Sequence, residues 1–146
     1  PAIYFNSLFG TSNDEAKFVI TGNNRDVNRY KWNIQNILNK LKNKESKQSN
    51  FYQNITNLLN IRKKQKAFHP NAARYNLNFG SKIFAFKRVS LDKKQSIICV
   101  TNLSSKIQNF TLNKTYLRWK NLIKLQSKLN KQLVLGPFET IWLSNK

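Results

Sequence analysis

Two neighbouring segments, PAIYFNSLFG (residues 1–10) and GNNRDVNRYKW (residues 22–32), decide the fold that this sequence predicts. Residues 2–5 (AIYF) form a short, continuous apolar run, which is typical of a strand buried on both faces. The polar stretch that follows, residues 6–31, carries Arg25 and Arg29. It is longer than the roughly 12–15 residues above which loops tend to be functional or disordered. We therefore predict a core strand that leads into a functional loop. A core strand without an earlier strand to pair with also leads us to expect a piece of a larger protein.

The formal net charge of +20 would suit a nucleic-acid binder, because lysine and arginine displace counterions from phosphates. However, 20 of the 26 basic residues are lysines, and arginine is the residue suited to bidentate phosphate contacts. The chain also contains 22 asparagines, and an excess of lysine and asparagine together is what an AT-rich coding bias produces at solvent-facing positions. The distribution of charge therefore argues against a dedicated nucleic-acid surface.

The composition predicts a globular protein that works in a reducing compartment. Hydrophobic residues make up 40% of the chain, and no apolar run approaches the roughly 20 residues that a membrane-spanning helix needs. The single cysteine, Cys99, lies in the apolar run of residues 97–100 and cannot form an internal disulfide. We expect it to be a small buried residue in a cytoplasmic protein.

Two helices are predicted after the loop. The first is indicated by apolar residues at helical spacing, namely Ile34, Ile37, Leu38 and Leu41. Residues 42–50 (KNKESKQSN) contain no apolar side chain and are predicted to form an exposed linker. A second helix is expected over residues 51–66, and Pro70 prevents it from continuing.

Beyond residue 71 the apolar pattern takes the period of strands. Five short strands are predicted, at residues 83–89, 96–102, 107–112, 132–135 and 138–143. Residues 92–94 (DKK) form the expected turn between the first two, whereas residues 117–129 could be a helix or a broken strand. Short strands at such close spacing indicate a small antiparallel sheet or sandwich. We place the domain boundary near residues 69–72, which gives domains 1–69 and 70–146.

A strand, a long loop and a helix followed by an all-β domain is the order expected at the end of an α/β barrel. We therefore predict the last strand-loop-helix unit of a (β/α)8 barrel, followed by a C-terminal antiparallel β domain. In such barrels the loops after the strands form the active-site face, which would place Arg25 and Arg29 near the chemistry.

The sequence contains no complete catalytic set. Its single histidine, His69, cannot build a histidine cluster, and it lies beside Pro70, where a structural hydrogen bond is expected. None of the six carboxylates is set in an apolar pattern that would raise its pKa for general acid catalysis. With four glycines there is no phosphate-binding glycine loop. We predict no catalytic residue, no metal site and no cofactor in this chain.

Four segments together resemble the C-terminal end of sucrose-phosphorylase-like enzymes of the α-amylase superfamily. They are PAIYFNSLFG (1–10), GNNRDVNRYKW (22–32), LLNIRKKQKAFHP (58–70) and LGPFETIWL (135–143). The subgroup includes phosphorylases acting on sucrose, sucrose phosphate, glucosylglycerate and glucosylglycerol. By this resemblance residues 2–5 would be the eighth barrel strand, residues 6–31 its active-site loop, and residues 51–66 the eighth helix.

The resemblance implies retaining glucosyl transfer to phosphate, with an aspartate nucleophile and a glutamate acid/base. In the family these residues come from earlier barrel strands, so a C-terminal fragment would be inactive alone. Arg25 matches the motif arginine that hydrogen-bonds the glucosyl unit. Asp26 or Asn28 would orient Arg25, and Arg29 would pack below the loop. The implied partners are a sugar substrate, inorganic phosphate and the preceding portion of the barrel.

Three other interpretations stay open from the sequence. Arg25 could simply pin a long loop through an ion pair. The chain could be a basic nucleic-acid-binding module, or it could be a non-functional remnant of a truncated gene.

Overall fold

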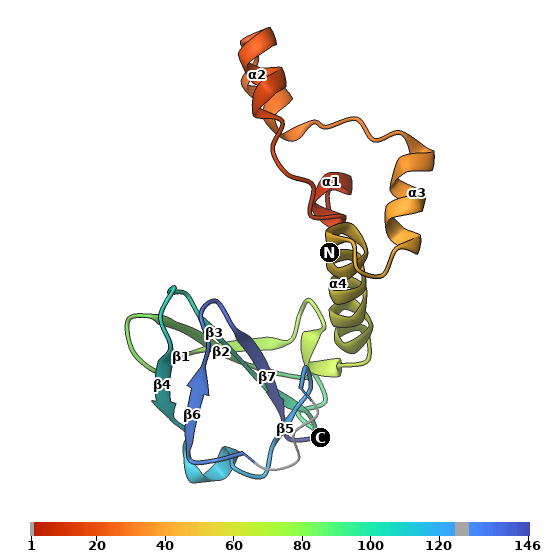
Figure 1. Ribbon diagram of the computed structural model, residues 1–146. Helices are drawn as coiled ribbons and strands as arrows, with labels where there is room; N and C mark the ends of the chain where they lie inside the picture. Colours follow the sequence, from red (N-terminus) through yellow and green to blue (C-terminus); the bar gives the residue numbers. More distant parts are fainter. Residues whose placement is uncertain (1, 125–128) are drawn as a thin grey trace. The chain divides into compact units, whose positions relative to one another are not determined.

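The computed structural model describes residues 2–124 and 129–146, and the chain divides into two compact units, Pro1–Leu59 and Asn60–Lys146 (Figure 1). The first unit is helical in all its regular elements within the described residues. These are α1 (Phe5–Leu8), α2 (Glu15–Thr21), the 3-10 helix η1 (Asn24–Asn28), α3 (Ile34–Lys42) and α4 (Lys47–Lys63), the last of which continues into the second unit.

The strand predicted at residues 2–5 is not formed, and this prediction was wrong for the chain by itself. Tyr4 has extended dihedral angles (φ −66°, ψ 139°), but α1 begins at the next residue. Ile3, Tyr4 and Phe5 are 39%, 54% and 52% exposed. A strand is held by hydrogen bonds to a neighbouring strand, and the described part of the first unit contains none. The apolar run therefore ends up in solvent.

The polar segment after this run is more ordered than a plain loop. The Asp14 carboxylate caps α2 by accepting from the Lys17 backbone N–H at 3.1 Å. Gly22 ends the helix in the left-handed conformation at φ +64°, which glycine adopts without strain.

The predicted helix near residues 34–41 is confirmed as α3, whose N-terminus is capped by the Asn33 side chain. The predicted linker was too long, because α4 already begins at Lys47. Polar residues of that segment make turn and capping contacts: the Ser46 hydroxyl accepts from the Ser49 N–H at 3.1 Å. At its other end, α4 stops at Lys63, three residues earlier than predicted.

The second unit is the expected antiparallel β domain. Its larger sheet has the order β1-β2-β3-β7-β5, and a separate two-stranded sheet pairs β4 with β6. The strands are β1 (Ala73–Asn78), β2 (Ile83–Val89), β3 (Ser96–Asn102), β4 (Gln108–Thr111), β5 (Lys120–Asn121), β6 (Gln132–Leu135) and β7 (Thr140–Ser144). The five predicted strands are confirmed as β2, β3, β4, β6 and β7, within two residues at each end.

The sequence predicted the other parts of this unit less completely. Strands β1 and β5 were not predicted. The ambiguous stretch 117–129 contributes β5 within a series of turns, and its residues 125–128 lie outside the described residues.

Strand β3 explains why residues 97–100 read as one continuous apolar run. Ile98 and Val100 lie in a core cluster that takes residues from both sheets, including Leu135. Ile97 and Cys99, which alternate with them, lie in a second cluster with Phe68. Both faces of the strand are therefore buried, which the continuous apolar pattern predicts. Burial of Cys99 is confirmed, and it raises the pKa of the thiol to about 12.

Candidate functional site

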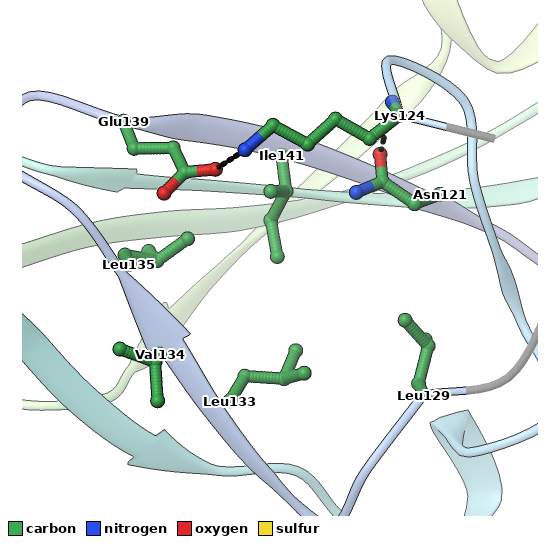
Figure 2. Close-up of a pocket in the computed structure, with 8 residues that line it drawn as sticks. All are labelled: Asn121, Lys124, Leu129, Leu133, Val134, Leu135, Glu139 and Ile141. Atoms are coloured by element: carbon green, nitrogen blue, oxygen red, sulfur yellow. Dashed lines mark hydrogen bonds and ion pairs between the residues drawn. The ribbon is translucent and has the colours of Figure 1, made fainter. Parts of the chain in front are cut away.

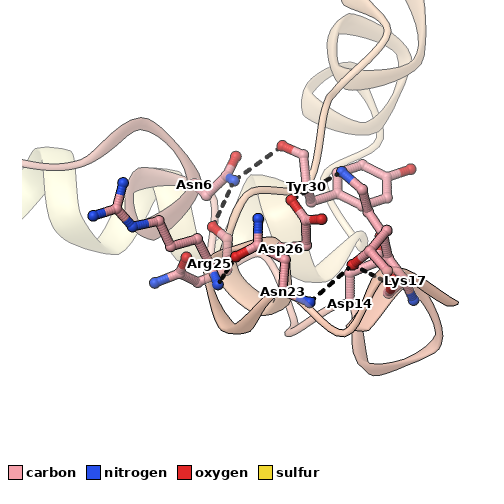
Figure 3. A network of polar contacts seen from close by, with 9 residues as sticks. Asn6, Asp14, Lys17, Asn23, Arg25, Asp26 and Tyr30 are labelled. Atoms are coloured by element: carbon pink, nitrogen blue, oxygen red, sulfur yellow. Dashed lines mark hydrogen bonds and ion pairs between the residues drawn. The ribbon is translucent and has the colours of Figure 1, made fainter. Parts of the chain in front are cut away.

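The candidate site is the anchored loop, residues 6–32, and its anchor is Asn6. Asn6 is only 6% exposed, and its side-chain amide donates to the backbone carbonyls of Asn28 at 3.2 Å and Tyr30 at 3.0 Å (Figure 3). These bonds join the start of the segment to residues 22 and 24 positions further along. The chain is thereby closed into a compact loop around η1.

Further hydrogen bonds order the interior of the anchored loop. The Asp14 backbone N–H donates to the Val27 carbonyl at 2.7 Å, which ties the start of α2 to η1. The Asn23 side chain accepts from the Arg25 backbone N–H at 3.1 Å and so caps η1. Each of these polar residues satisfies a backbone group at a helix start, which is their common role at such positions. The backbone of Arg25 is therefore fixed in place.

The Arg25 side chain is exposed and points away from the Asp26–Lys17 pair, as Figure 3 shows. Among residues 2–124 and 129–146, its guanidinium takes part in no hydrogen bond or ion pair. The interpretation in which Arg25 pins the loop through an ion pair therefore finds no support in the described part of the chain. A fixed backbone with a free guanidinium suits an arginine that meets a ligand.

Asp26 pairs with Lys17, at 3.6 Å between Nζ and Oδ1, and not with Arg25. The neighbouring Thr21 hydroxyl contributes most to lowering the pKa of Asp26; burial opposes this, and the Lys17 ammonium and the Arg29 guanidinium lower the pKa further. Asp26 is therefore an ionised link between α2 and η1.

Asn28 and Arg29 lie on the same loop with exposed side chains, and the Asn28 carbonyl receives the Asn6 amide. The roles predicted for Asp26 and Asn28 in orienting Arg25, and for Arg29 in packing below the loop, stay predictions. Sequence reasoning did not find Asn6 or Lys17. Their contacts with Asn28 and Asp26 join positions far apart along the chain, and no local pattern marks them.

The other titratable groups of interest have structural partners. The His69 ring Nδ1 accepts from the Asn71 backbone N–H at 3.2 Å, which agrees with the structural role predicted for it. The pKa values of Asp92 and Glu139 are lowered, the first chiefly by the Ser90 hydroxyl and the second chiefly by Lys124. Each stays ionised, whereas a catalytic acid needs a raised pKa.

The described residues contain no cluster of three or more histidine, cysteine or acidic side chains that could hold a metal ion. None of the helices in the part that the structure describes is long and apolar enough to cross a membrane.

A cavity of about 140 Å³ lies in the second unit (Figure 2). Apolar side chains such as Leu133, Leu135 and Ile141 form much of its wall, and the ion pair between Lys124 and Glu139 lies along it. Half of its lining residues, namely Leu129, Leu133, Leu135 and Ile141, belong to the hydrophobic core or pack against it. Its polar side chains are already engaged within the chain: Lys124 pairs with Glu139, and Asn121 accepts from the backbone N–H groups of Ile123 and Lys124. The anchored loop is therefore the stronger candidate site.

Comparison with known proteins relates the chain to a group of enzymes. No family model matches. Glucosylglycerate phosphorylase of Spirochaeta thermophila is 27% identical over 99% of this chain, and that of Escherichia coli K12 is 28% identical over 98%. The chain is homologous to the glucosylglycerate phosphorylases. This confirms the resemblance to the sucrose-phosphorylase-like subgroup that the sequence segments predicted. The chain spans about a quarter of the length of these relatives, 27% and 25% respectively.

Solved structures show the same fold. The trehalulose synthase MutB of Pseudomonas mesoacidophila MX-45 superposes with a TM-score of 0.55 at 18% identity, over 73% of this chain and 19% of that protein. An α-glucosyl transfer enzyme, XgtA, gives the same TM-score of 0.55 at 15% identity, over 72% of this chain and 19% of its own. At these identities the likeness concerns the fold alone.

Proposed function

We propose that this chain forms the C-terminal part of a retaining α-glucosyl phosphorylase and supplies one wall of its glucose-binding site. Glucosylglycerate is the favoured glucoside because the curated relatives carry that name, and sucrose is the related alternative. The observation that carries the proposal is Arg25. Its backbone is fixed by the anchored loop, and its guanidinium is exposed and unpaired within the described residues.

Arg25 would bind the glucosyl unit by donating to a sugar hydroxyl. A hydrogen bond from a charged donor contributes about 1.5–3 kcal/mol. In retaining transfer, a carboxylate attacks the anomeric carbon and forms a covalent glucosyl-enzyme. A second carboxyl, about 5–5.5 Å away, protonates the leaving group, and phosphate then takes up the sugar. Arg25 would hold the sugar in register for both steps.

The catalytic carboxylates would come from a preceding barrel portion. Within the described residues the perturbed carboxyl groups, Asp26, Asp92 and Glu139, all have lowered pKa values, and none is suited to act as the general acid. The exposed apolar run at residues 2–5 would become the eighth strand once a neighbouring strand is supplied. In this arrangement residues 1–69 would belong to the barrel and residues 70–146 to the β domain.

The test is Arg25→Ala in the active enzyme that contains this chain together with the catalytic carboxylates. We expect kcat/KM for phosphorolysis of glucosylglycerate to fall by about 10- to 100-fold, because one charged hydrogen bond to the sugar is lost. Arg118→Ala is the matched control, since Arg118 is an exposed arginine in the second unit, and it should leave kcat/KM unchanged.

Near-normal kinetics for Arg25→Ala would remove Arg25 from the sugar site. Phosphorolysis by the chain alone would refute the assignment of the carboxylates to another portion of the protein.

A further inference from the structure

A second pocket, the Tyr30 pocket, lies within the first unit. Its volume is about 280 Å³, slightly below the range of about 300–1,000 Å³ typical of drug-sized ligands. The residues that argue for a ligand are Ser12, Asp14, Tyr30, Trp32, Lys40 and Gln48. Arg25 does not line it. The Tyr30 pocket is therefore a separate feature from the arginine that the proposed function uses.

One wall of the Tyr30 pocket is aromatic and held in place. The rings of Tyr30 and Trp32 meet edge to face, with centroids 4.9 Å apart. The Trp32 indole N–H donates to the Thr11 hydroxyl at 3.0 Å, which fixes the orientation of the indole ring. The backbone of Tyr30 is held by the Asn6 amide. An ordered aromatic wall of this kind can cover the C–H face of a small ligand without losing much conformational entropy.

The rest of the wall is polar, and several of its donors and acceptors make no hydrogen bond to the described residues, so they can bind a ligand. Among residues 2–124 and 129–146, the side chains of Ser12, Lys40 and Gln48 have no hydrogen-bond partner. The Asp14 carboxylate accepts one backbone bond from Lys17, and a carboxylate can accept several more. One ammonium and one carboxylate offset each other, so the lining favours a neutral ligand over a strong anion.

We propose that the Tyr30 pocket binds a neutral monosaccharide unit. One C–H face of the sugar ring lies against one ring of the Tyr30–Trp32 pair, and the hydroxyls exchange hydrogen bonds with Asp14, Lys40 and Gln48. Aromatic walls with a few convergent polar groups are the usual construction of a small-ligand site, and the volume limits the ligand to about one sugar ring. This assignment does not depend on Arg25 or on the reaction proposed above.

The test uses the full chain labelled with nitrogen-15 and titrated with D-glucose. The indole N–H of Trp32 lies in the pocket wall, and Trp32→Phe identifies its NMR signal. We expect that signal to move saturably, with a dissociation constant in the millimolar range, while the indole signals of Trp119 and Trp142 in the second unit stay fixed.

Lys40→Ala should weaken glucose binding by about fivefold, the effect of losing one hydrogen bond. The matched control is Lys42→Ala, an exposed lysine of the same helix that does not line the pocket, and it should bind glucose as the parent chain does.

Three outcomes would overturn the proposal. The Trp32 signal could stay fixed up to about 100 mM glucose, which excludes even weak binding. Inorganic phosphate could move the signal when glucose does not, which would make the pocket an anion site. Lys40→Ala and Lys42→Ala could weaken glucose binding equally, which would point to a general effect of charge.

Arg25→Ala separates this proposal from the proposed function. It should leave the glucose shift of Trp32 unchanged whatever it does to phosphorolysis. Loss of the shift in that variant would contradict a site independent of Arg25.

Discussion

Asn6 is the residue on which the anchored loop depends most. Asn6→Ala removes the donors to the carbonyls of Asn28 and Tyr30. We expect the free energy of unfolding of the first unit to fall by about 1–2 kcal/mol, because both carbonyls can regain only part of the bonding from water. Urea unfolding measures the loss, and faster hydrogen exchange of the amides around residues 28–30 would locate it. Asn54→Ala, an exposed asparagine of α4, is the control and should not destabilise the unit. Equal stability of Asn6→Ala and the parent chain would show that Asn6 does not anchor the loop.

Alanine substitutions at two glycines of the first unit distinguish the cost of backbone strain from the cost of a steric clash. Gly10 and Gly22 both have positive φ, +56° and +64°. A Cβ at Gly10 would lie 2.8 Å from Cγ of Phe51, whereas a Cβ at Gly22 would meet nothing within 4 Å. We expect Gly22→Ala to cost about 1 kcal/mol from backbone strain alone. Gly10→Ala should cost about 2–4 kcal/mol, because the Phe51 ring must also move. Thermal unfolding of the two variants gives the comparison, and equal losses would exclude a clash with Phe51.

At the scale of elements, the turn between β2 and β3 is held by a charged side chain. Asp92 accepts from the Ser90 hydroxyl at 2.6 Å and the Lys94 backbone N–H at 3.1 Å, and it pairs with Lys66 at 3.2 Å. These contacts, with Ser90 the strongest, hold the pKa of Asp92 well below its usual range.

Because this pKa is lowered in the folded chain, the stabilisation by Asp92 is present above the ordinary aspartate pKa and is lost as the pH falls below it. We therefore expect Asp92→Asn to be less stable than the parent chain at pH 7, with a difference that shrinks steadily below about pH 4. Urea midpoints at pH 7 and pH 3 test this. A difference that stays constant or grows on acidification would contradict the role given to the carboxylate.

The elements that sequence predicted well are those whose burial is decided locally. Strands β2 and β3 carry strong apolar patterns, and the turn at residues 92–94 separates them, so their bounds were found. Strand β1 was missed because ARYNLN is almost entirely exposed and shows no apolar face. The strand at residues 2–5 failed for the opposite reason. Its apolar residues indicate burial, but strand formation also needs a neighbour that the described part of the unit does not contain.

The candidate site was predictable only in part for a similar reason. Arg25 could be found because it lies in a short motif, RDVNR. The Tyr30 pocket could not, because it joins side chains from residues 11–14, 30, 32, 40 and 48. Their meeting depends on how α3 and α4 fold back, which no short segment encodes.

The whole molecule combines a high positive charge with exposed apolar side chains. Ile20, Val19 and Ile34 in the first unit are 83%, 80% and 69% exposed, while the formal net charge is +20. Charge repulsion opposes self-association, and salt screens that repulsion within about 10 Å at 0.1 M.

We therefore expect the chain to be largely monomeric at low salt and to associate as salt is raised. Sedimentation velocity at about 50 and 500 mM NaCl measures this, since the Debye length falls several-fold between them. Ile20→Lys should suppress the association, and association that weakens with salt would contradict it. The nucleic-acid alternative predicts the opposite trend, because binding to phosphates weakens steeply as salt rises.

The order of strands in the larger sheet sets the moment at which this protein can fold during translation. Strand β7, at Thr140–Ser144, lies between β3 and β5, and it pairs residue by residue with β3, as in Val100 with Ile141. A nascent chain that has reached β5 still lacks the strand to which β5 pairs. The β domain therefore cannot close its sheet cotranslationally until residue 144 has left the ribosome. A chain that ends before Thr140 would lack β7. The edge of β3 that pairs with β7 would then be open to other strands.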